Sequence, residues 1–213
     1  MKLDRSSGIL LHPTSFPGPD GIGDLGPEAY RWVDFLVSAK CAIWQILPLG
    51  PTGFGDSPYQ AFSAFAGNPY LVSPTILLDQ EILTDEDLAD RPDFPADTVD
   101  FGPVIEWKLT LLRRAYRNYR KKPSLCKKEF ETFCSENAEW LDDYSLFRAI
   151  KDAQGGTLWT TWPAAFRLRD PKAIARFKDA NADAIEEQKF YQFLFFRQWK
   201  NVKDYANKKG ITI

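Results

Sequence analysis

The sequence has few cysteines and histidines, no long apolar run and almost no charge imbalance. It holds 3 cysteines and 1 histidine in 213 residues, with a net charge of -2. An odd, small number of cysteines argues against a disulfide framework. The near-zero charge argues against nucleic acid or an anionic membrane as a partner. No uncharged apolar run approaches the ~20 residues of a membrane-spanning helix, so we expect no membrane segment.

Four further absences narrow the possible functions. The first five residues lack the apolar core of a signal peptide. Cys41, Cys126 and Cys134 are therefore interpreted as reduced, small apolar residues of a cytoplasmic protein. No metal-ligand cluster, phosphate-binding glycine loop or nucleophile–base signature is present. We therefore expect no metal ion and no cofactor, and the sequence leaves the oligomeric state open.

Aromatic residues, in contrast, are abundant at 15% of the chain. Two short apolar runs, residues 8–13 and 42–47, flank a helical pattern from Pro27 to about Lys40. Strand, helix and strand with short joints predict a βαβ unit, whose two parallel strands should be buried on both faces.

The rest of the chain has mainly helical patterning. Helices are predicted at residues 83–88, 104–120, 124–134, 136–152, 171–178 and 182–209. Thr84 is expected to cap the first of these, and Gly210 to end the last. The final residues, 211–213, have strand propensity. A strand that stops so soon after a long helix predicts that the chain is a piece of a larger α/β fold.

The segment from residue 50 to 74 is too rich in glycine and proline for a regular element, yet it holds many aromatic rings. They are Phe54, Tyr59, Phe62, Phe65 and Tyr70. We call residues 52–70 the aromatic loop. It follows the carboxyl end of the second strand, where sites form in α/β folds, and long loops of this kind are usually functional.

The loop has the residue types that a sugar site needs. Aromatic rings pack against the apolar face of a pyranose, and side chains such as Asp56, Ser57 and Asn68 bond its hydroxyl groups. Tyr59 offers both a ring and a hydroxyl. The alternative is that these rings seal the top of a barrel or an inserted subdomain, and Phe62 and Phe65 are interpreted as core. His12, at the end of the first strand, is more typical of a hydrogen-bonded structural residue than of a catalyst.

Several blocks of the sequence resemble those of a known enzyme family. They are residues 7–17, 21–26, 44–52, 56–60 and 63–71. In this order they resemble the amylomaltases, the 4-α-glucanotransferases of glycoside hydrolase family 77. The most distinctive block begins Asp56-Ser57-Pro58-Tyr59-Gln60.

The resemblance implies an α/β fold, namely the first strands of a (β/α)₈ TIM barrel with a mainly helical inserted subdomain. It implies a first βαβ part at residues 1–75, a helical insertion at 76–180, and a barrel helix with the start of a third strand at 181–213. It also implies transfer of α-1,4-glucan segments between maltooligosaccharides by retaining double displacement, without a cofactor.

The same resemblance places the catalytic carboxylates on later strands, so no residue of this chain is predicted to be catalytic. Asp20, Asp24, Asp56 and Asp79 match no catalytic motif, and the first two are interpreted as turn residues. By the same resemblance Tyr59, Asp56 and Ser57 fall in the glucan-contacting loop. The substrate-binding prediction is completed by Asn68, His12 and Phe54. Phe54 stands where many family members have tyrosine, so a hydroxyl contact is not expected there.

Two other functions remain open on the residues alone. The first is a non-catalytic module that binds α-glucan. The second is an interaction domain that uses the aromatic loop on a protein partner.

Overall fold

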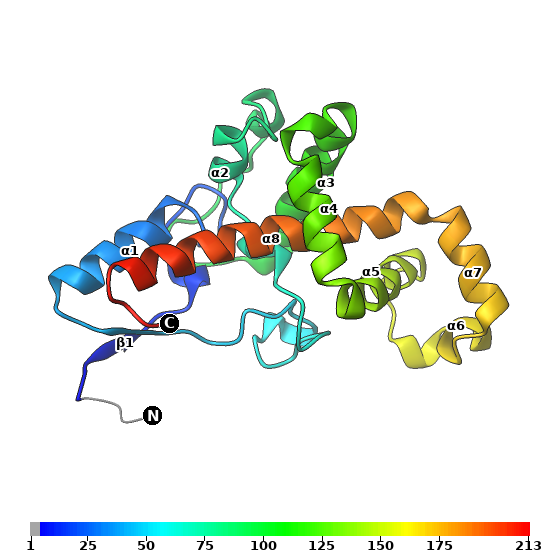
Figure 1. The fold of residues 1–213 in the computed structure, drawn as a ribbon, viewed down its shortest axis with the longest axis horizontal. Coiled ribbons are helices and arrows are strands. Elements are labelled where there is room, and N and C mark those ends of the chain that lie inside the picture. Colours follow the sequence, from blue (N-terminus) through cyan, green and yellow to red (C-terminus); the bar gives the residue numbers. More distant parts are fainter. Residues whose placement is uncertain (1–4) are drawn as a thin grey trace. The chain divides into compact units, whose positions relative to one another are not determined.

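The computed structural model describes residues 5–213, apart from the side chain of Phe54. The chain forms two compact units, which we call unit 1 and unit 2 (Figure 1). Unit 1 is Met1–Leu125 with Leu194–Ile213, and unit 2 is Cys126–Phe193. Unit 1 holds β1 (Gly8–Leu10), α1 (Pro27–Ser38), β2 (Ile43–Gln45), α2 (Pro74–Asp79) and α3 (Phe101–Lys121). Unit 2 holds α4 (Lys127–Glu136), α5 (Ala138–Ala153), α6 (Ala164–Arg167) and α7 (Pro171–Ala180).

The long helix α8 (Ala182–Lys208) starts in unit 2 and ends in unit 1. Most of the described chain is helical, and its only named sheet has two strands. β1 and β2 are parallel, with Ile9 opposite Trp44, which confirms the predicted βαβ unit. Thr212 forms a parallel bridge with Ile43, so the last residues do reach β2 as a strand would. The division at residues 75 and 180 stays a prediction.

Burial of this sheet on both faces was a wrong prediction. Trp44 is fully buried, whereas Leu10 is 51% exposed and Ile43 is 36% exposed. In the described residues α1 packs on β2 and buries Trp44, but a sheet of two short strands presents its other face and one edge to solvent. The strands are also shorter than the apolar runs that predicted them, because pairing stops at Leu10 and Gln45.

Helix α1 begins as the sequence indicates and packs beside the end of α8. Pro27 occupies the first helical position, and Ala29, Val33 and Leu36 are its buried residues. In Figure 1 the helix lies along the last turns of α8, where the rings of Tyr30 and Tyr205 meet edge to face at 5.1 Å. This contact closes the βαβ unit against the C-terminal helix.

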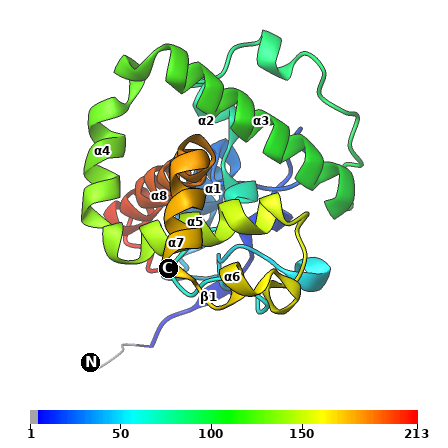
Figure 2. The ribbon, with the colours of Figure 1, turned by 90° about the vertical axis from the view of Figure 1, so that its right-hand side faces the viewer.

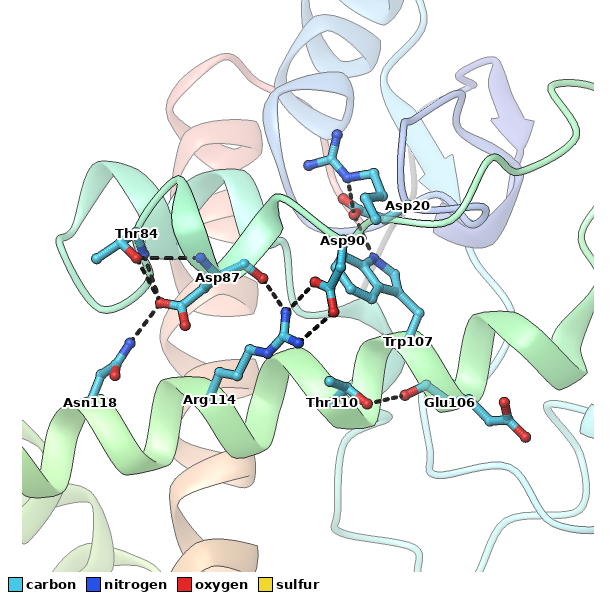
Figure 3. Close-up of polar contacts among 10 residues, drawn as sticks. Asp20, Thr84, Asp87, Asp90, Glu106, Trp107, Thr110, Arg114 and Asn118 are labelled. Atoms are coloured by element: carbon cyan, nitrogen blue, oxygen red, sulfur yellow. Dashed lines mark hydrogen bonds and ion pairs between the residues drawn. The ribbon is translucent and has the colours of Figure 1, made fainter.

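Helix α3 anchors the segment that precedes it (Figure 3). Arg114 donates to both carboxylate oxygens of Asp90, at 2.6 and 2.7 Å. The predicted helix at residues 83–88 is only a 3-10 turn, Glu86–Leu88. Thr84 nevertheless caps the start of this turn through two reciprocal hydrogen bonds. The Thr84 N–H donates to the Asp87 carboxylate at 3.0 Å, and the Asp87 N–H donates to the Thr84 hydroxyl at 3.4 Å.

Asp20 is more than the turn residue that the sequence predicted. It is 2% exposed, accepts from the Trp107 indole N–H at 2.9 Å and lies 3.1 Å from Arg91 Nε. These contacts fix the loop after β1 to α3. Trp107 and Asp20 are drawn together in Figure 3.

Unit 2 has its own small apolar core. Figure 2 shows the ribbons of α5, α6 and α7, whose side chains form most of it. Leu146 and Ile150 of α5 pack with Trp162, and side chains of α6 and α7 complete the cluster. The helix ends where Gly155 and Gly156 take φ values of 66° and 75°. The helices predicted at 124–134, 136–152 and 171–178 are confirmed, each within one turn of its observed ends.

Three further observations concern the described cysteines, helices and potential metal ligands. Cys41, Cys126 and Cys134 are not joined in disulfides, and burial raises the pKa of Cys134 to about 11. Within residues 5–213 no helix is long and apolar enough to cross a membrane. The same residues hold no group of three or more side chains suited to a metal ion.

Candidate functional site

The aromatic loop leaves β2 and folds back on itself. The Gly53 N–H donates to the Gln60 carbonyl at 2.8 Å, and Thr52 forms an antiparallel bridge with Ala61. Between them Gly55 and Asp56 both take left-handed backbone conformations, with φ of 67° and 53°. Such a conformation is uncommon for a residue other than glycine, although aspartate adopts it more readily than most. The turn projects Tyr59 outward, where it is 72% exposed.

Asn68 anchors the returning end of the loop. Its backbone N–H donates to the Leu49 carbonyl at 2.7 Å, and its side-chain oxygen accepts from the Tyr70 N–H at 3.0 Å. It thereby caps the 3-10 turn Pro69–Leu71 and is 5% exposed. Asn68 therefore holds the loop in shape, and its contact with a ligand stays a prediction.

A pocket of about 440 Å³ lies between the aromatic loop and α8. Its lining comprises Pro48, Leu49, Gly50, Pro58, Tyr59, Ala61, Ser63, Ala64, Phe65, Ala66, Gly67, Phe195, Phe196 and Trp199. The backbone approaches α8 so closely that a Cβ added to Gly67 would lie 2.0 Å from the Phe195 ring. Glycine is thus required at this wall of the pocket.

His12 lies near the carbonyl of Pro48, which belongs to the segment between β2 and the aromatic loop. Its Nδ1 accepts from the Thr14 N–H at 3.3 Å and lies 2.8 Å from the Thr14 hydroxyl oxygen, so it caps the 3-10 turn Pro13–Ser15. In the neutral ring the proton then sits on Nε2, which forms no hydrogen bond within the described residues. Burial lowers the pKa of His12, and the nearby Pro48 carbonyl opposes that shift only in part. Burial thus favours the neutral form of the imidazole.

The structure brings some of the predicted residues to the pocket and leaves others beside it. Tyr59 lines it, whereas Asp56 and Ser57 are half-buried in the loop outside the described lining. The Ser57 hydroxyl accepts from the Tyr59 N–H at 3.3 Å, so it orients the chain next to the tyrosine. The backbone of Phe54 forms part of a 3-10 turn, and its side chain lies outside the described residues.

The interpretation of Phe62 and Phe65 as core was wrong. Phe62 is 38% exposed and Phe65 is 68% exposed, and Phe65 lines the pocket. Their loop folds back on itself at the surface, so hydrophobicity alone misplaced both rings. Sequence reasoning also missed Phe195, Phe196 and Trp199 of α8 as pocket residues. The wide apolar face of the last helix was the available signal, and it was interpreted only as packing.

The chemical character of the pocket is that of a binding surface. None of its described lining residues carries a charge. Aromatic rings stand on both sides, with Tyr59 and Phe65 from the loop and Trp199 from α8. Such walls suit a neutral ligand that has apolar faces and hydroxyl edges. They offer no carboxylate pair for acid–base or nucleophilic chemistry.

Comparison with known proteins assigns the chain to a family. Residues 11–213 match the sequence profile of glycoside hydrolase family 77, described as 4-alpha-glucanotransferase. The chain therefore belongs to that family.

Relatives match along the whole chain. It is 47% identical to a 4-alpha-glucanotransferase of Thermus thermophilus over 214 residues, covering 100% of the chain and 42% of that protein. It is 44% identical to one of a Synechocystis strain, covering 98% of the chain and 42% of that protein.

A solved structure agrees with the fold. The amylomaltase of Streptococcus agalactiae in complex with acarbose superposes with a TM-score of 0.93 at 37% identity, over 99% of this chain and 42% of that chain. This chain thus spans well under half the length of the proteins that it matches.

Proposed function

We propose that the protein is a 4-α-glucanotransferase that transfers α-1,4-glucan segments between maltooligosaccharides. The observation that carries this proposal is the uncharged, aromatic-walled pocket beneath Tyr59, in a chain that belongs to a 4-alpha-glucanotransferase family. The crystallised relative binds acarbose. A pocket with rings on both sides can hold glucose units by their apolar faces.

We further propose a division of labour along the polypeptide. Residues 1–75 and the end of α8 would form the first part of a (β/α)₈ barrel, with a helical insertion between them. Tyr59, supported by Asp56, Ser57, Asn68, His12 and Phe54, would contact the glucan. Retaining transfer needs a nucleophilic carboxylate and a carboxylic acid close together. No residue of this chain is assigned to either role, so both would come from a further part of the polypeptide.

Disproportionation of maltotriose tests the proposal. The protein as its gene encodes it should release glucose and form longer maltooligosaccharides, because a bound acceptor sugar resolves the covalent intermediate in place of water. The 213-residue chain alone should bind the sugar without turning it over. Binding can be measured as quenching of tryptophan fluorescence, because Trp199 lines the pocket.

The outcomes separate the proposed function from its alternatives. Sugar binding without turnover by either form would favour a non-catalytic α-glucan-binding module. No binding and no turnover would favour an interaction domain that uses the aromatic loop on a protein partner. Turnover by the chain alone would contradict the assignment of the catalytic groups to another part of the polypeptide.

A further inference from the structure

Two consecutive residues just beyond the aromatic loop are held by buried polar side chains from two different helices. Val72 and Ser73 are each 1% exposed. The Val72 carbonyl accepts from Lys108 Nζ of α3 at 3.0 Å, and Ser73 is bonded twice by Gln198 of α8. We call these four residues the clamp. All four lie in unit 1.

The contact between Gln198 and Ser73 satisfies both polar groups of one backbone residue. Gln198 Oε1 accepts from the Ser73 N–H at 2.7 Å, and its Nε2 donates to the Ser73 carbonyl at 3.1 Å. The amide orientation follows from chemistry, because a backbone N–H only donates and a carbonyl only accepts. Ser73 precedes α2, so its N–H has no partner inside that helix. Without Gln198 a buried donor would be left unbonded.

Lys108 extends the clamp to the loop that follows β1. Its side chain is 1% exposed, and its Nζ lies 2.9 Å from Asp24 Oδ2. The other oxygen of Asp24 accepts from the Gly26 N–H at 2.9 Å, at the start of α1. One buried ammonium therefore joins α3, the loop after β1 and the end of the aromatic loop. Each partner limits the movement of the other two.

The clamp is continuous with the pocket through α8. Gln198 directly precedes Trp199 and lies one turn after Phe195, and both rings line the pocket. The opposite wall belongs to the aromatic loop, and Ser73 follows that loop, two residues after the turn Pro69–Leu71. The helix that forms one wall thus also holds the chain just beyond the other wall.

We infer that Gln198 and Lys108 are positioning residues for α-glucan binding, which fix the aromatic loop against α8 by holding Ser73 and Val72. The inference rests on the proposed function. Neither residue is among the described lining of the pocket, so each acts through the loop. Holding the loop in the free protein removes an ordering cost that the ligand would otherwise meet.

The test compares two substitutions of Gln198 in the protein as its gene encodes it. Gln198→Met keeps the side-chain length and removes both hydrogen bonds. Maltooligosaccharide affinity should fall roughly tenfold, with KM rising more than kcat falls. Gln198→Glu restores both bonds only as the neutral acid, whose carbonyl accepts and whose O–H donates. Burial raises the pKa of such a carboxyl group, so affinity should approach that of the wild type as pH falls from about 9 to about 5.

Gln80→Met is the matched control. Gln80 also bonds α8, through Arg197, but at the far end of α2 from Ser73. Its loss should lower the thermal midpoint and leave affinity and its pH dependence unchanged. Wild-type affinity in Gln198→Met would overturn the inference. So would a Gln198→Glu variant that is no better than Gln198→Met at the lowest pH.

Hydrogen exchange separates this inference from the proposed function. In the free protein, the amides of residues 54–72 should exchange faster in Gln198→Met than in the wild type or in Gln80→Met. If the wild type bound no glucan, the proposed function would fail, and faster exchange would still show that the clamp orders the loop. Unchanged exchange would overturn the clamp whatever the wild type binds.

Discussion

Tyr59 combines two properties that a packed core residue cannot have. Its ring is 72% exposed at the tip of a folded loop, and the turn before it holds Gly55 and Asp56 in left-handed conformations. Non-glycine residues in that region cost free energy and cluster at functional sites. The left-handed conformation of Asp56 therefore costs free energy, and the turn that contains it presents the Tyr59 ring beside the pocket.

Removal of the Tyr59 ring should weaken glucan binding. Tyr59→Ala should lower maltooligosaccharide affinity roughly tenfold, because stacked ring area is lost, whereas Tyr59→Phe should lose only the hydroxyl contact and about threefold. Fluorescence titration measures both. Phe35→Ala is the control, since Phe35 is 49% exposed on α1 and does not line the pocket. Equal affinities for Tyr59→Ala and the wild type would contradict the assigned role.

At the scale of the element, the contact between α1 and α8 joins the βαβ unit to the C-terminal helix. Asp34 of α1 accepts from the Tyr205 hydroxyl at 2.7 Å and lies 3.0 Å from Lys209 Nζ. The hydrogen bond from Tyr205, together with that from Lys209, lowers the pKa of Asp34 below its ordinary value of 3.8. The carboxylate form therefore stabilises the folded chain.

This shift predicts an acid-dependent contribution to stability. A carboxyl group whose pKa is lowered by folding contributes fully above its ordinary value of 3.8, and loses that contribution as pH falls through the lower folded value. Asp34→Asn should flatten the fall in urea midpoint below about pH 4 and leave the slope near neutral pH unchanged. Asp79→Asn, an exposed carboxyl of α2, is the control. An unchanged acid slope in Asp34→Asn would contradict this reading.

At the scale of the whole molecule, several large apolar side chains of unit 1 are exposed. Leu10 and Ile43 of the sheet and Phe35 and Val37 of α1 are each at least 36% exposed. The strands also present an edge to solvent, which favours pairing with another chain. Exposed apolar side chains beside an open strand edge favour contact with another surface or aggregation.

The 213-residue chain on its own should therefore self-associate and unfold without a sharp cooperative transition. Leu10→Lys should reduce the association seen by sedimentation without lowering the thermal midpoint, because Leu10 is 51% exposed. Leu168→Lys alters an exposed leucine of unit 2 and should leave association unchanged. A monomeric chain with one sharp transition would contradict this expectation.

Local sequence pattern predicts much of the fold. The helices came from apolar periodicity, Pro27 marked the start of α1, and Gly210, with φ of 80°, marked the end of α8. The aromatic loop was found from composition and from its place after β2. Ends of elements were less predictable, as at Glu86–Leu88, where side-chain bonds to Asp87 favour a 3-10 turn over a helix.

The sequence by itself determined the helical elements and the loop that carries Tyr59, because each depends on residues close together in the chain. The short strand–helix–strand spacing also predicted the parallel strand pair, and the sequence motifs indicated the family. Only the tertiary structure decided that Phe65 faces the pocket, that Trp199 forms its opposite wall, and that Lys108 and Gln198 are buried on Val72 and Ser73. These contacts join residues that are far apart in sequence. Apolar periodicity predicts which face of a helix is buried. The segment that packs on that face depends on the tertiary fold, which brings distant parts of the chain together.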